Sequence, residues 1–250
     1  MQGQPAHPAA RPRRTGRPGR HAVRVRHRRQ PGARPVSVPA GTRAPAGVRS
    51  ARPGDVAGRD VAGRDVAGWG PVATPDGPFR LLPVRGGEHL GLLHRWMNDP
   101  VVAEYWDLAG PPARTEEHLR AQTGGDGRSV PCLGLLDGRP TSYWEIYRAD
   151  LDPLADHYAA RPHDTGVHLL IGEAADRGRG LGALLLDAVA RLVLDRRPGC
   201  PRLVAEPDVR NHASLGAFRK AGFRRAGTLE LPGKRAALMI RGRGVVGGTH

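Results

Sequence analysis

Two neighbouring segments have the clearest pattern in the chain: Thr165-Gly-Val-His-Leu-Leu-Ile-Gly172 and the glycine-rich turn Arg177-Gly-Arg-Gly-Leu-Gly182. The first segment is short and apolar, as in a strand. After the turn, apolar residues recur every three or four positions, which predicts a helix. These residues are Leu181, Leu184, Leu185, Ala188, Val189 and Leu192. A strand that passes through glycines into a helix forms an anion site, because the first amides of the helix have no intrahelical partner and its dipole favours negative charge.

The chain after this helix predicts a short strand, a helix and a strand pair. Pro201-Arg-Leu-Val-Ala-Glu206 is the strand, and Pro207-Asp-Val-Arg-Asn211 is a polar turn that opens a helix over 212–221. Gly222 is the expected C-terminal stop of that helix. Residues 223–231 and 235–240 are expected to form an antiparallel pair.

The preceding part predicts strands and helices in alternation. We expect strands at 79–84, 130–136 and 140–147, helices at 88–97 and 115–122, and one helical turn near 154–158 in a polar insertion over 150–162. Asn98-Asp-Pro100 ends the first helix, and Thr115 is a plausible N-cap of the second. Asp137-Gly138 indicates a hairpin turn. Together these elements predict an α/β fold, a mixed, mostly antiparallel sheet with helices on both faces.

Positive charge is concentrated at the N-terminus. The chain has 250 residues and a net charge of +15. Residues 1–75 contain 15 Arg and 3 Asp, a net of +12, which leaves +3 for residues 76–250. Residues 1–75 lack hydrophobic periodicity, so we expect a disordered tail. Its alternatives are an electrostatic anchor for nucleic acid or anionic lipid, an inert solvated segment, or an over-long start-site assignment; we favour an inert role over nucleic-acid binding.

The expected domain boundaries follow from this composition. Residues 76–241 are expected to form the folded domain, and 242–250 a flexible C-terminal tail. Cys132 and Cys200 have no metal-ligand or disulfide spacing, so we expect two buried thiols and no metal site. Neither a membrane span nor a secretory signal is recognisable, and a cytoplasmic location is expected.

The order of elements, with Arg-x-x-Gly-x-Gly at 177–182 and Lys220-Ala-Gly-Phe223 after a short helix, resembles the GNAT N-acetyltransferase superfamily over roughly residues 79–240. A narrower resemblance is to siderophore-type acyltransferases, which include N6-hydroxylysine acetyltransferases and mycobactin-type lysine N-acyltransferases. It is carried by five blocks: Leu93-His-Arg-Trp-Met-Asn98, Tyr143-Trp-Glu-Ile-Tyr147, Asp164–Gly172, Glu206–Asn211 and Leu231–Met239.

The resemblance implies an acyl-CoA, carrying acetyl or a longer chain, or an acyl-carrier-protein thioester as donor. The donor phosphates would meet the amides of Arg179, Gly180, Leu181 and Gly182, where Gly178, Gly180 and Gly182 allow close approach and Arg177 and Arg179 add charge. The alternative for these glycines is a tight turn that packs against the sheet. A backbone amide near Leu169 and Leu170 would bind the oxyanion, and Asn211 would reach the pantetheine arm.

The acceptor implied by the resemblance is a small-molecule amine or hydroxylamine. A lysine ammonium with a pKa of about 10.4 costs roughly 4–5 kcal/mol to deprotonate at pH 7. A general base would lower this cost, and the resemblance implies that Glu206 is the catalytic proton acceptor and that His168 contacts the substrate. Asp208 either binds the acceptor or caps the next helix. Glu206 and His168 could instead be a surface ion-pair partner and a structural histidine.

The sequence departs from the family pattern at Phe218, where a tyrosine often protonates the leaving thiolate, and at Gly233 and Val101. The expected function is siderophore-type N-acylation at the N6 of lysine, N6-hydroxylysine or a related diamine. The alternatives are an aminoglycoside 6'-N-acetyltransferase and a nucleic-acid-binding protein whose acyltransferase fold is inert.

Overall fold

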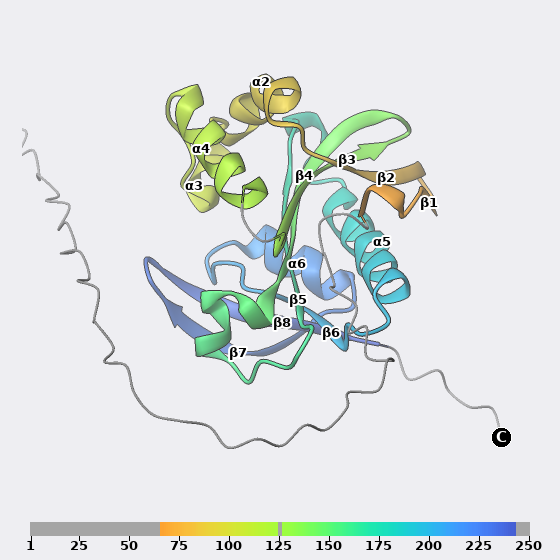
Figure 1. Cartoon of the computed structure of the whole chain (residues 1–250), viewed down its shortest axis with the longest axis vertical. Coiled ribbons are helices and arrows are strands. Elements are labelled where there is room, and N and C mark those ends of the chain that lie inside the picture. Colours follow the sequence, from red (N-terminus) through yellow and green to blue (C-terminus); the bar gives the residue numbers. More distant parts are fainter. Residues whose placement is uncertain (1–65, 125–126, 244–250) are drawn as a thin grey trace, which may run out of the picture. The chain divides into compact units, whose positions relative to one another are not determined.

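The computed structural model describes residues 66–124 and 127–243, and every structural statement below concerns these residues. They form one eight-stranded sheet in the order β1-β2-β3-β4-β5-β6-β8-β7 (Figure 1). All neighbouring strands are antiparallel except β5 and β6. The strands are β1 (Val72–Thr74), β2 (Gly77–Pro83), β3 (Ser129–Leu136), β4 (Arg139–Arg148), β5 (Thr165–Ile171), β6 (Arg202–Ala205), β7 (Arg224–Leu231) and β8 (Lys234–Gly242). The prediction of a mixed, mostly antiparallel sheet is confirmed.

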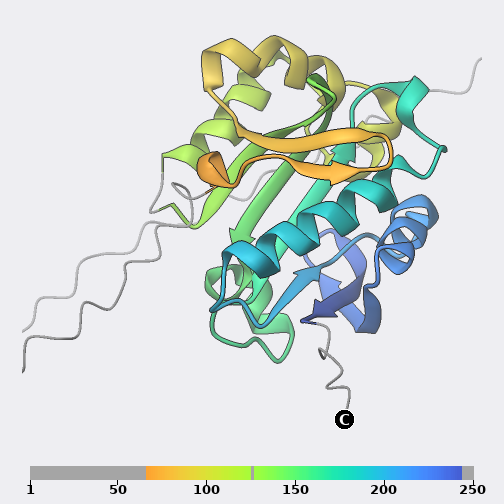
Figure 2. The ribbon, with the colours of Figure 1, turned by 90° about the vertical axis from the view of Figure 1, so that its right-hand side faces the viewer.

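Helices cover both faces of the sheet, as predicted (Figure 2). Alternate side chains of β4 point to opposite faces. Tyr143 packs with the first set of helices, whereas its neighbour Trp144 packs with Leu185 of the long helix on the other face. The first set is α2 (Gly86–Met97), α3 (Pro100–Trp106) and α4 (Pro112–Thr123); the long helix is α5 (Leu181–Arg196), and α6 (His212–Lys220) follows β6.

The sheet opens between β5 and β6. These strands pair only at Thr165 with Leu203 and at Gly166 with Val204. Beyond this point β5 continues to Ile171, still paired with β4 on its other side, whereas β6 ends at Ala205. One edge of β5 therefore has no neighbouring strand over most of its length, and the candidate site is built along this edge.

Several local predictions are confirmed. Asp137 and Gly138 have φ values of 48° and 76°, the left-handed conformation that a tight β3–β4 hairpin requires. Gly222, with φ of 80°, directly follows the C-cap of α6. The expected helical turn in the polar insertion is the 3-10 helix η3 (Pro153–His157), which follows η2 (Ala149–Leu151).

Two predictions about the first helices were wrong. Thr115 does not cap α4, because the helix begins at Pro112 after Pro111, and Thr115 is buried inside it. The sequence analysis also missed α3. Pro100 ends α2 but simultaneously starts α3, where the Asp99 side chain accepts a hydrogen bond from the amide of Val101. Proline at the first helical position suits a helix start as well as a helix stop.

The structured part begins before residue 76. The 3-10 helix η1 (Val66–Gly68) and β1 lie in the predicted tail, yet Val66 and Trp69 are only 1% and 4% exposed. The guanidinium of Arg197 lies 5.2 Å from the centre of the Trp69 ring. Three-residue elements have no detectable periodicity, which is why the pattern did not show them. The remaining tail predictions concern 1–65 and 244–250, outside the described residues.

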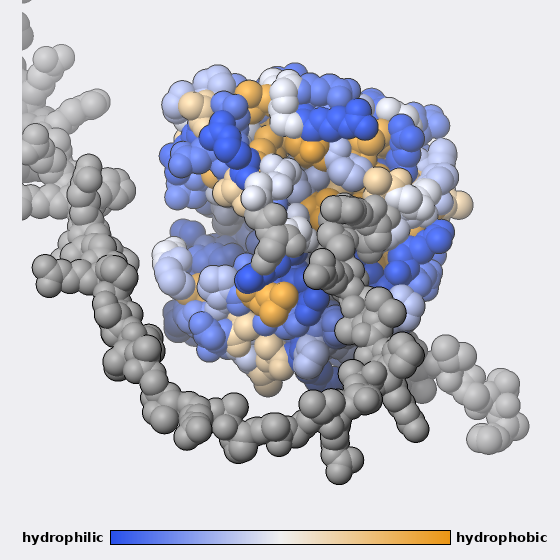
Figure 3. Space-filling model, viewed as in Figure 1, coloured by the Kyte–Doolittle hydropathy of each residue, from blue (hydrophilic) through white to orange (hydrophobic). Residues whose placement is uncertain are grey.

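The surface of the domain is mixed in polarity, and Figure 3 shows hydrophilic residues over most of its upper left, where α3 and α4 lie. Val101 and Leu151, which are 60% and 47% exposed, are the large hydrophobic residues exposed in the described ranges. No helix in those ranges combines the length and the hydropathy that crossing a membrane requires.

Candidate active site

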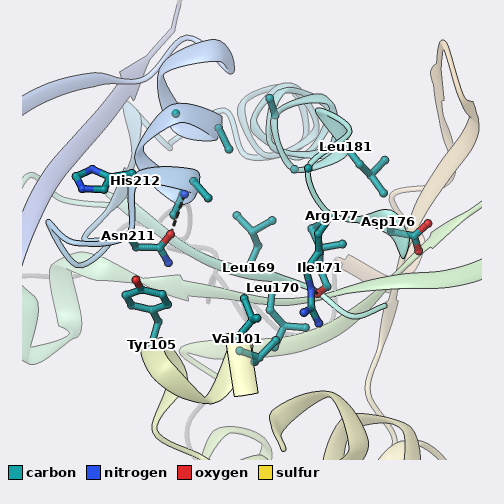
Figure 4. Close-up of a pocket in the computed structure, with 18 of the residues that line it drawn as sticks. Val101, Tyr105, Leu169, Leu170, Ile171, Asp176, Arg177, Leu181, Asn211 and His212 are labelled. Carbon is teal, nitrogen blue, oxygen red and sulfur yellow. Dashed lines mark hydrogen bonds between the residues drawn. The ribbon is translucent and has the colours of Figure 1, made fainter. Parts of the chain in front are cut away.

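A cavity of about 430 Å³ lies between the open edge of β5, the N-terminus of α5 and the first turn of α6 (Figure 4). We call it the donor cavity. All predicted donor residues except Arg179 line it: Leu169, Leu170, Arg177, Gly178, Gly180, Leu181, Gly182 and Asn211. Arg179 is exposed at the turn. The structure therefore brings together the segments that the sequence analysis assigned to one site.

The N-terminus of α5 leaves room for an anion. Gly178 and Gly180 have φ values of 74° and 87°, and an added Cβ on either would meet no atom within 4 Å. Gly180 is the N-cap, and no side chain caps the helix or places a negative charge in its first turn. Since the first amides of a helix need acceptors, this end is suited to a phosphate group.

Arg177 stabilises the turn itself. Its guanidinium donates hydrogen bonds to the carbonyl oxygens of Ile171 and Gly172 at the end of β5 and to the Asp99 carboxylate at 2.9 Å. The bond from Arg177 lowers the pKa of Asp99. Arg177 thus joins the start of α3 to the end of β5, and its positive charge is already partly neutralised.

The open edge of β5 narrows the choice of oxyanion donor. The amide of Gly172 donates to the carbonyl of Thr141 on the β4 side. Because backbone groups alternate along a strand, the amide of Leu170 also faces β4, whereas the amide of Leu169 faces the open edge. Of the two residues named from the sequence, Leu169 has the better orientation for a thioester carbonyl in the donor cavity.

A second cavity of about 320 Å³ adjoins the first and is here called the acceptor cavity. His168, Glu206 and Asp208, the three predicted catalytic and acceptor residues, all line it, together with Glu145, His118 and Lys234. The two cavities share Tyr105, Trp106, Leu169, Asn211 and Ser214. Their junction is therefore where a donor carbonyl and an acceptor nitrogen can meet.

His168 lies between two buried carboxylates. Its Nε2 is 2.6 Å from Oε1 of Glu206, and its Nδ1 is 2.8 Å from Oε2 of Glu145. Burial alone would lower the pKa of His168, but the two carboxylates outweigh it and raise the pKa to about 10. The ring is thus an imidazolium at neutral pH, with both N–H groups donating.

Glu206 follows β6 directly and is 6% exposed. Besides His168, its carboxylate accepts a hydrogen bond from the Tyr147 hydroxyl at 3.1 Å. The Lys234 ammonium lies 3.5 Å from the carboxylate and 2.9 Å from the Glu206 carbonyl oxygen. Burial would raise the pKa of Glu206, but the charge and hydrogen bond of His168, with Lys234, lower it to about 2. Glu206 is therefore ionised and partnered.

The sequence analysis missed the second half of this charged cluster. Glu145 on β4 accepts hydrogen bonds from His118 at 2.7 Å, from the Tyr143 hydroxyl at 3.1 Å and from Gln122. Tyr143 and Glu145 lie in a block already quoted for the family resemblance, which was the available signal. His118 and Gln122 are four residues apart on α4, where nothing in the sequence distinguishes them from surface residues.

Asp208 and Asn211 organise the turn after β6. The Asp208 carboxylate binds the Arg210 guanidinium at 2.8 Å and accepts from the Arg210 amide, so Asp208 does not cap α6. Asn211 is the N-cap instead, accepting from the amide of Ser214 at 2.9 Å. Asp208 still lines the acceptor cavity.

The structure shows where the three residues that depart from the family pattern lie. Phe218 is 3% exposed and packs edge-on against Phe223, so its position offers no proton to a leaving thiolate. Gly233 has φ of 81° in the β7–β8 turn, next to Lys234. Exposed Val101 lines the donor cavity.

The described ranges contain no group of three or more His, Cys, Asp or Glu residues arranged to hold a metal ion. Cys132 and Cys200 are buried in the core packed around α5.

Known proteins resemble this chain over the region just described. A lysine N-acyltransferase MbtK from Mycobacterium sp. (strain MCS) is 36% identical over 168 residues, which cover 67% of this chain and 68% of that protein. An N(6)-hydroxylysine O-acetyltransferase from Escherichia coli is 34% identical over 60% of this chain and 47% of its own length.

Solved structures agree with the fold. The aminoglycoside acetyltransferase AAC(6')-Ib in complex with coenzyme A is 26% identical with a TM-score of 0.58, covering 66% of this chain and 95% of that one. An uncharacterised protein from Bacillus halodurans is 32% identical with a TM-score of 0.65, covering 70% of this chain and 91% of the other.

The family model described as the acetyltransferase (GNAT) domain matches residues 86–231. This range includes the charged cluster up to Glu206, the glycine-rich turn and the open edge of β5. The chain belongs to the GNAT acetyltransferase family and is an acyltransferase that uses an acyl-CoA donor.

Proposed function

We propose that this enzyme transfers an acyl group from a thioester to the N6 nitrogen of lysine, N6-hydroxylysine or a related diamine during siderophore assembly. The observation that carries the proposal is the charged cluster of Glu206 and His168 beside the junction of the donor and acceptor cavities. Relatives that match the chain are named as lysine, hydroxylysine and hydroxyornithine acyltransferases, which supports this acceptor class.

The donor side works through backbone groups. The phosphates of the donor bind at the N-terminus of α5, and the pantetheine arm runs along the open edge of β5. The amide of Leu169 then stabilises the negative charge that develops on the carbonyl oxygen. Because Cys132 and Cys200 are buried in the core, neither can carry the acyl group, and we infer direct transfer in a ternary complex.

The acceptor side removes a proton. A neutral nitrogen attacks the carbonyl carbon, the C–N bond forms and the C–S bond breaks. Attack makes the N–H far more acidic, so even a carboxylate with a pKa of about 2 can accept its proton as the new bond forms. Since Phe218 has no dissociable proton, water or another group of the site returns the proton to the thiolate.

An aminoglycoside acetyltransferase is the second candidate, because AAC(6')-Ib shares the fold with a TM-score of 0.58. The MbtK relative is more similar in sequence, 36% against 26%, and we therefore favour the lysine-type acceptor. We also propose that an acyl carrier protein can present the donor and that the enzyme acts in the cytoplasm. A nucleic-acid role would depend on residues 1–75, of which 1–65 lie outside the described residues.

The proposal is tested by competition between acceptors. Purified enzyme is supplied with acetyl-CoA and equal amounts of lysine, N6-hydroxylysine and kanamycin, and the products are identified by mass spectrometry. We expect acylation at N6 of lysine or hydroxylysine. Acylation of the aminoglycoside alone would remove the siderophore function but keep the acyltransferase.

A further inference from the structure

Glu145 is a buried carboxylate that the proposed acyl transfer does not itself use. It is 6% exposed and lies on β4 directly opposite His168 of β5. Its two oxygens have different partners. Oε2 accepts only from His168 among the hydrogen bonds found in the described residues, at 2.8 Å, whereas Oε1 accepts from His118, Tyr143 and Gln122.

This arrangement determines which atoms carry protons. The Nε2 group of Gln122 can only donate to Oε1, so Oε1 acts as an acceptor. The pKa of Glu145 is held below its ordinary value: burial would raise it, but the hydrogen bonds from His118 and His168 outweigh burial. An ionised Oε2 facing Nδ1 of His168 in turn requires that Nδ1 carries a proton.

The surroundings of His168 agree with a protonated ring. Glu145 and Tyr147 face it from β4, Glu206 from the end of β6, and the Trp106 ring from α3. Lys234 of β8 is the other cation in contact with Glu206. Two buried carboxylates therefore balance two partly exposed cations.

We propose that Glu145 is a positioning residue that keeps His168 protonated at Nδ1, so that both ring nitrogens donate and the ring is held in place between Glu145 and Glu206. This inference rests on the proposed function, and it assigns a role to a residue that does not touch the reacting atoms. His118 and Gln122 of α4 donate hydrogen bonds to Oε1 of Glu145 and so hold its carboxylate in the orientation that His168 needs. The catalytic geometry thus depends on a helix at the opposite side of the charged cluster from Glu206.

Glu145→Gln tests this role because the amide cannot reproduce the hydrogen bonds. If its NH2 group took the place of Oε1, it would face the NH2 group of Gln122, which is also a donor. If it took the place of Oε2, it would face Nδ1 of His168, which must then lose its proton to accept. The second orientation breaks fewer contacts, so the variant should contain a neutral His168.

The primary measurement is an NMR titration of the histidine rings, with His168 assigned by the signals missing from a His168→Asn variant. In the wild type, His168 should remain an imidazolium until about pH 10. In Glu145→Gln its pKa should fall toward the ordinary value of about 6.5. Glu173→Gln is the matched control, because Glu173 binds Arg95 and Trp96 instead of His168.

The second readout is the pH profile of kcat with a hydroxylamine acceptor. Glu145→Gln should lower kcat about tenfold at neutral pH through misplacement of the site. Its activity should recover toward pH 6, where His168 regains its proton, and the KM for the acyl donor should stay unchanged.

The proposal is overturned if wild-type His168 is neutral at pH 8, a result that needs no variant to fold. It is also overturned if Glu145→Gln titrates like the wild type, or loses activity equally at every pH. The titration does not depend on turnover. A wild type with an imidazolium but without acyl transfer to any amine would therefore refute the proposed function and leave the protonation argument standing.

Discussion

The donor and acceptor cavities meet at Leu169 and Asn211 but are built in different ways. The donor cavity depends on backbone: an uncapped helix start, glycines in left-handed conformations and a strand edge without a neighbour. The acceptor cavity depends on side chains, with an imidazolium held between two buried carboxylates. Recognition by backbone suits a constant donor, whereas a cluster of charged side chains can be adapted to one acceptor.

Substitutions in the two cavities should therefore have different kinetic effects, and the largest loss of activity is expected from the acceptor cavity. Glu206→Gln removes the proton acceptor and the partner of His168, and should lower kcat with lysine by at least about 10²-fold. The KM for acetyl-CoA should change little, because the donor cavity is untouched. Steady-state kinetics measure both quantities.

Glu230→Gln is the matched control for Glu206→Gln. Glu230 lies on β7, pairs with Arg235, and has a side chain that is 77% exposed. Its replacement should leave turnover near the wild-type rate. Wild-type turnover in Glu206→Gln would instead refute the assignment of Glu206 as the proton acceptor.

Gly180→Val should damage the donor cavity alone. The φ of 87° at Gly180 is strained for a β-branched residue, so the turn must change shape and the amides at the start of α5 move. We expect donor affinity to fall about tenfold, with kcat at saturating donor close to the wild-type value. Calorimetric titration with CoA measures the affinity, and an unchanged dissociation constant would show that the phosphates bind elsewhere.

The acceptor cavity should also make stability depend on pH. The pKa of Glu206 is lowered to about 2 from 4.5, so its contribution is present above about pH 4.5 and is lost as the pH falls toward 2. The pKa of His168 is raised, so its contribution is present below about pH 6.5 and is lost as the pH rises through about 10. The free energy of unfolding measured with urea should therefore be constant between about pH 4.5 and 6.5.

Glu206→Gln sharpens this pH test. Because it removes a carboxylate with a lowered pKa, the variant should lose less stability than the wild type between pH 4.5 and 2. If the free energy of unfolding fell equally in the two proteins between pH 4.5 and 2, this would contradict the ion pair between Glu206 and His168.

The smallest effect is expected from removing residues 1–65, because the described residues that line the two cavities all lie between positions 101 and 234. Turnover and the thermal midpoint should stay near the wild-type values. Removing residues 1–75 should lower the thermal midpoint by several degrees, since it also deletes buried Val66 and Trp69. Equal midpoints for the two truncations would contradict the packing of η1 on the core, and a loss of turnover without 1–65 would give that segment a role.

The contrast between the cavities also explains what the sequence could predict. Nine of the 21 described residues that line the donor cavity lie in the contiguous segment 165–182, where glycine spacing and apolar periodicity are visible directly. His168 and Glu206 were predicted because the family resemblance included their blocks. Glu145 and His118 were missed because their importance arises only when β4 and α4 pack beside β5.

The separate roles of the donor and acceptor cavities are tested most directly by a crystal structure with a bisubstrate analogue. In this analogue, CoA is joined through an acyl linker to N6 of lysine. We expect the pyrophosphate at the first amides of α5 and the N6 nitrogen within hydrogen-bonding distance of the Glu206 carboxylate. A pyrophosphate bound away from residues 178–182, or an N6 nitrogen directed away from Glu206 and His168, would contradict the account.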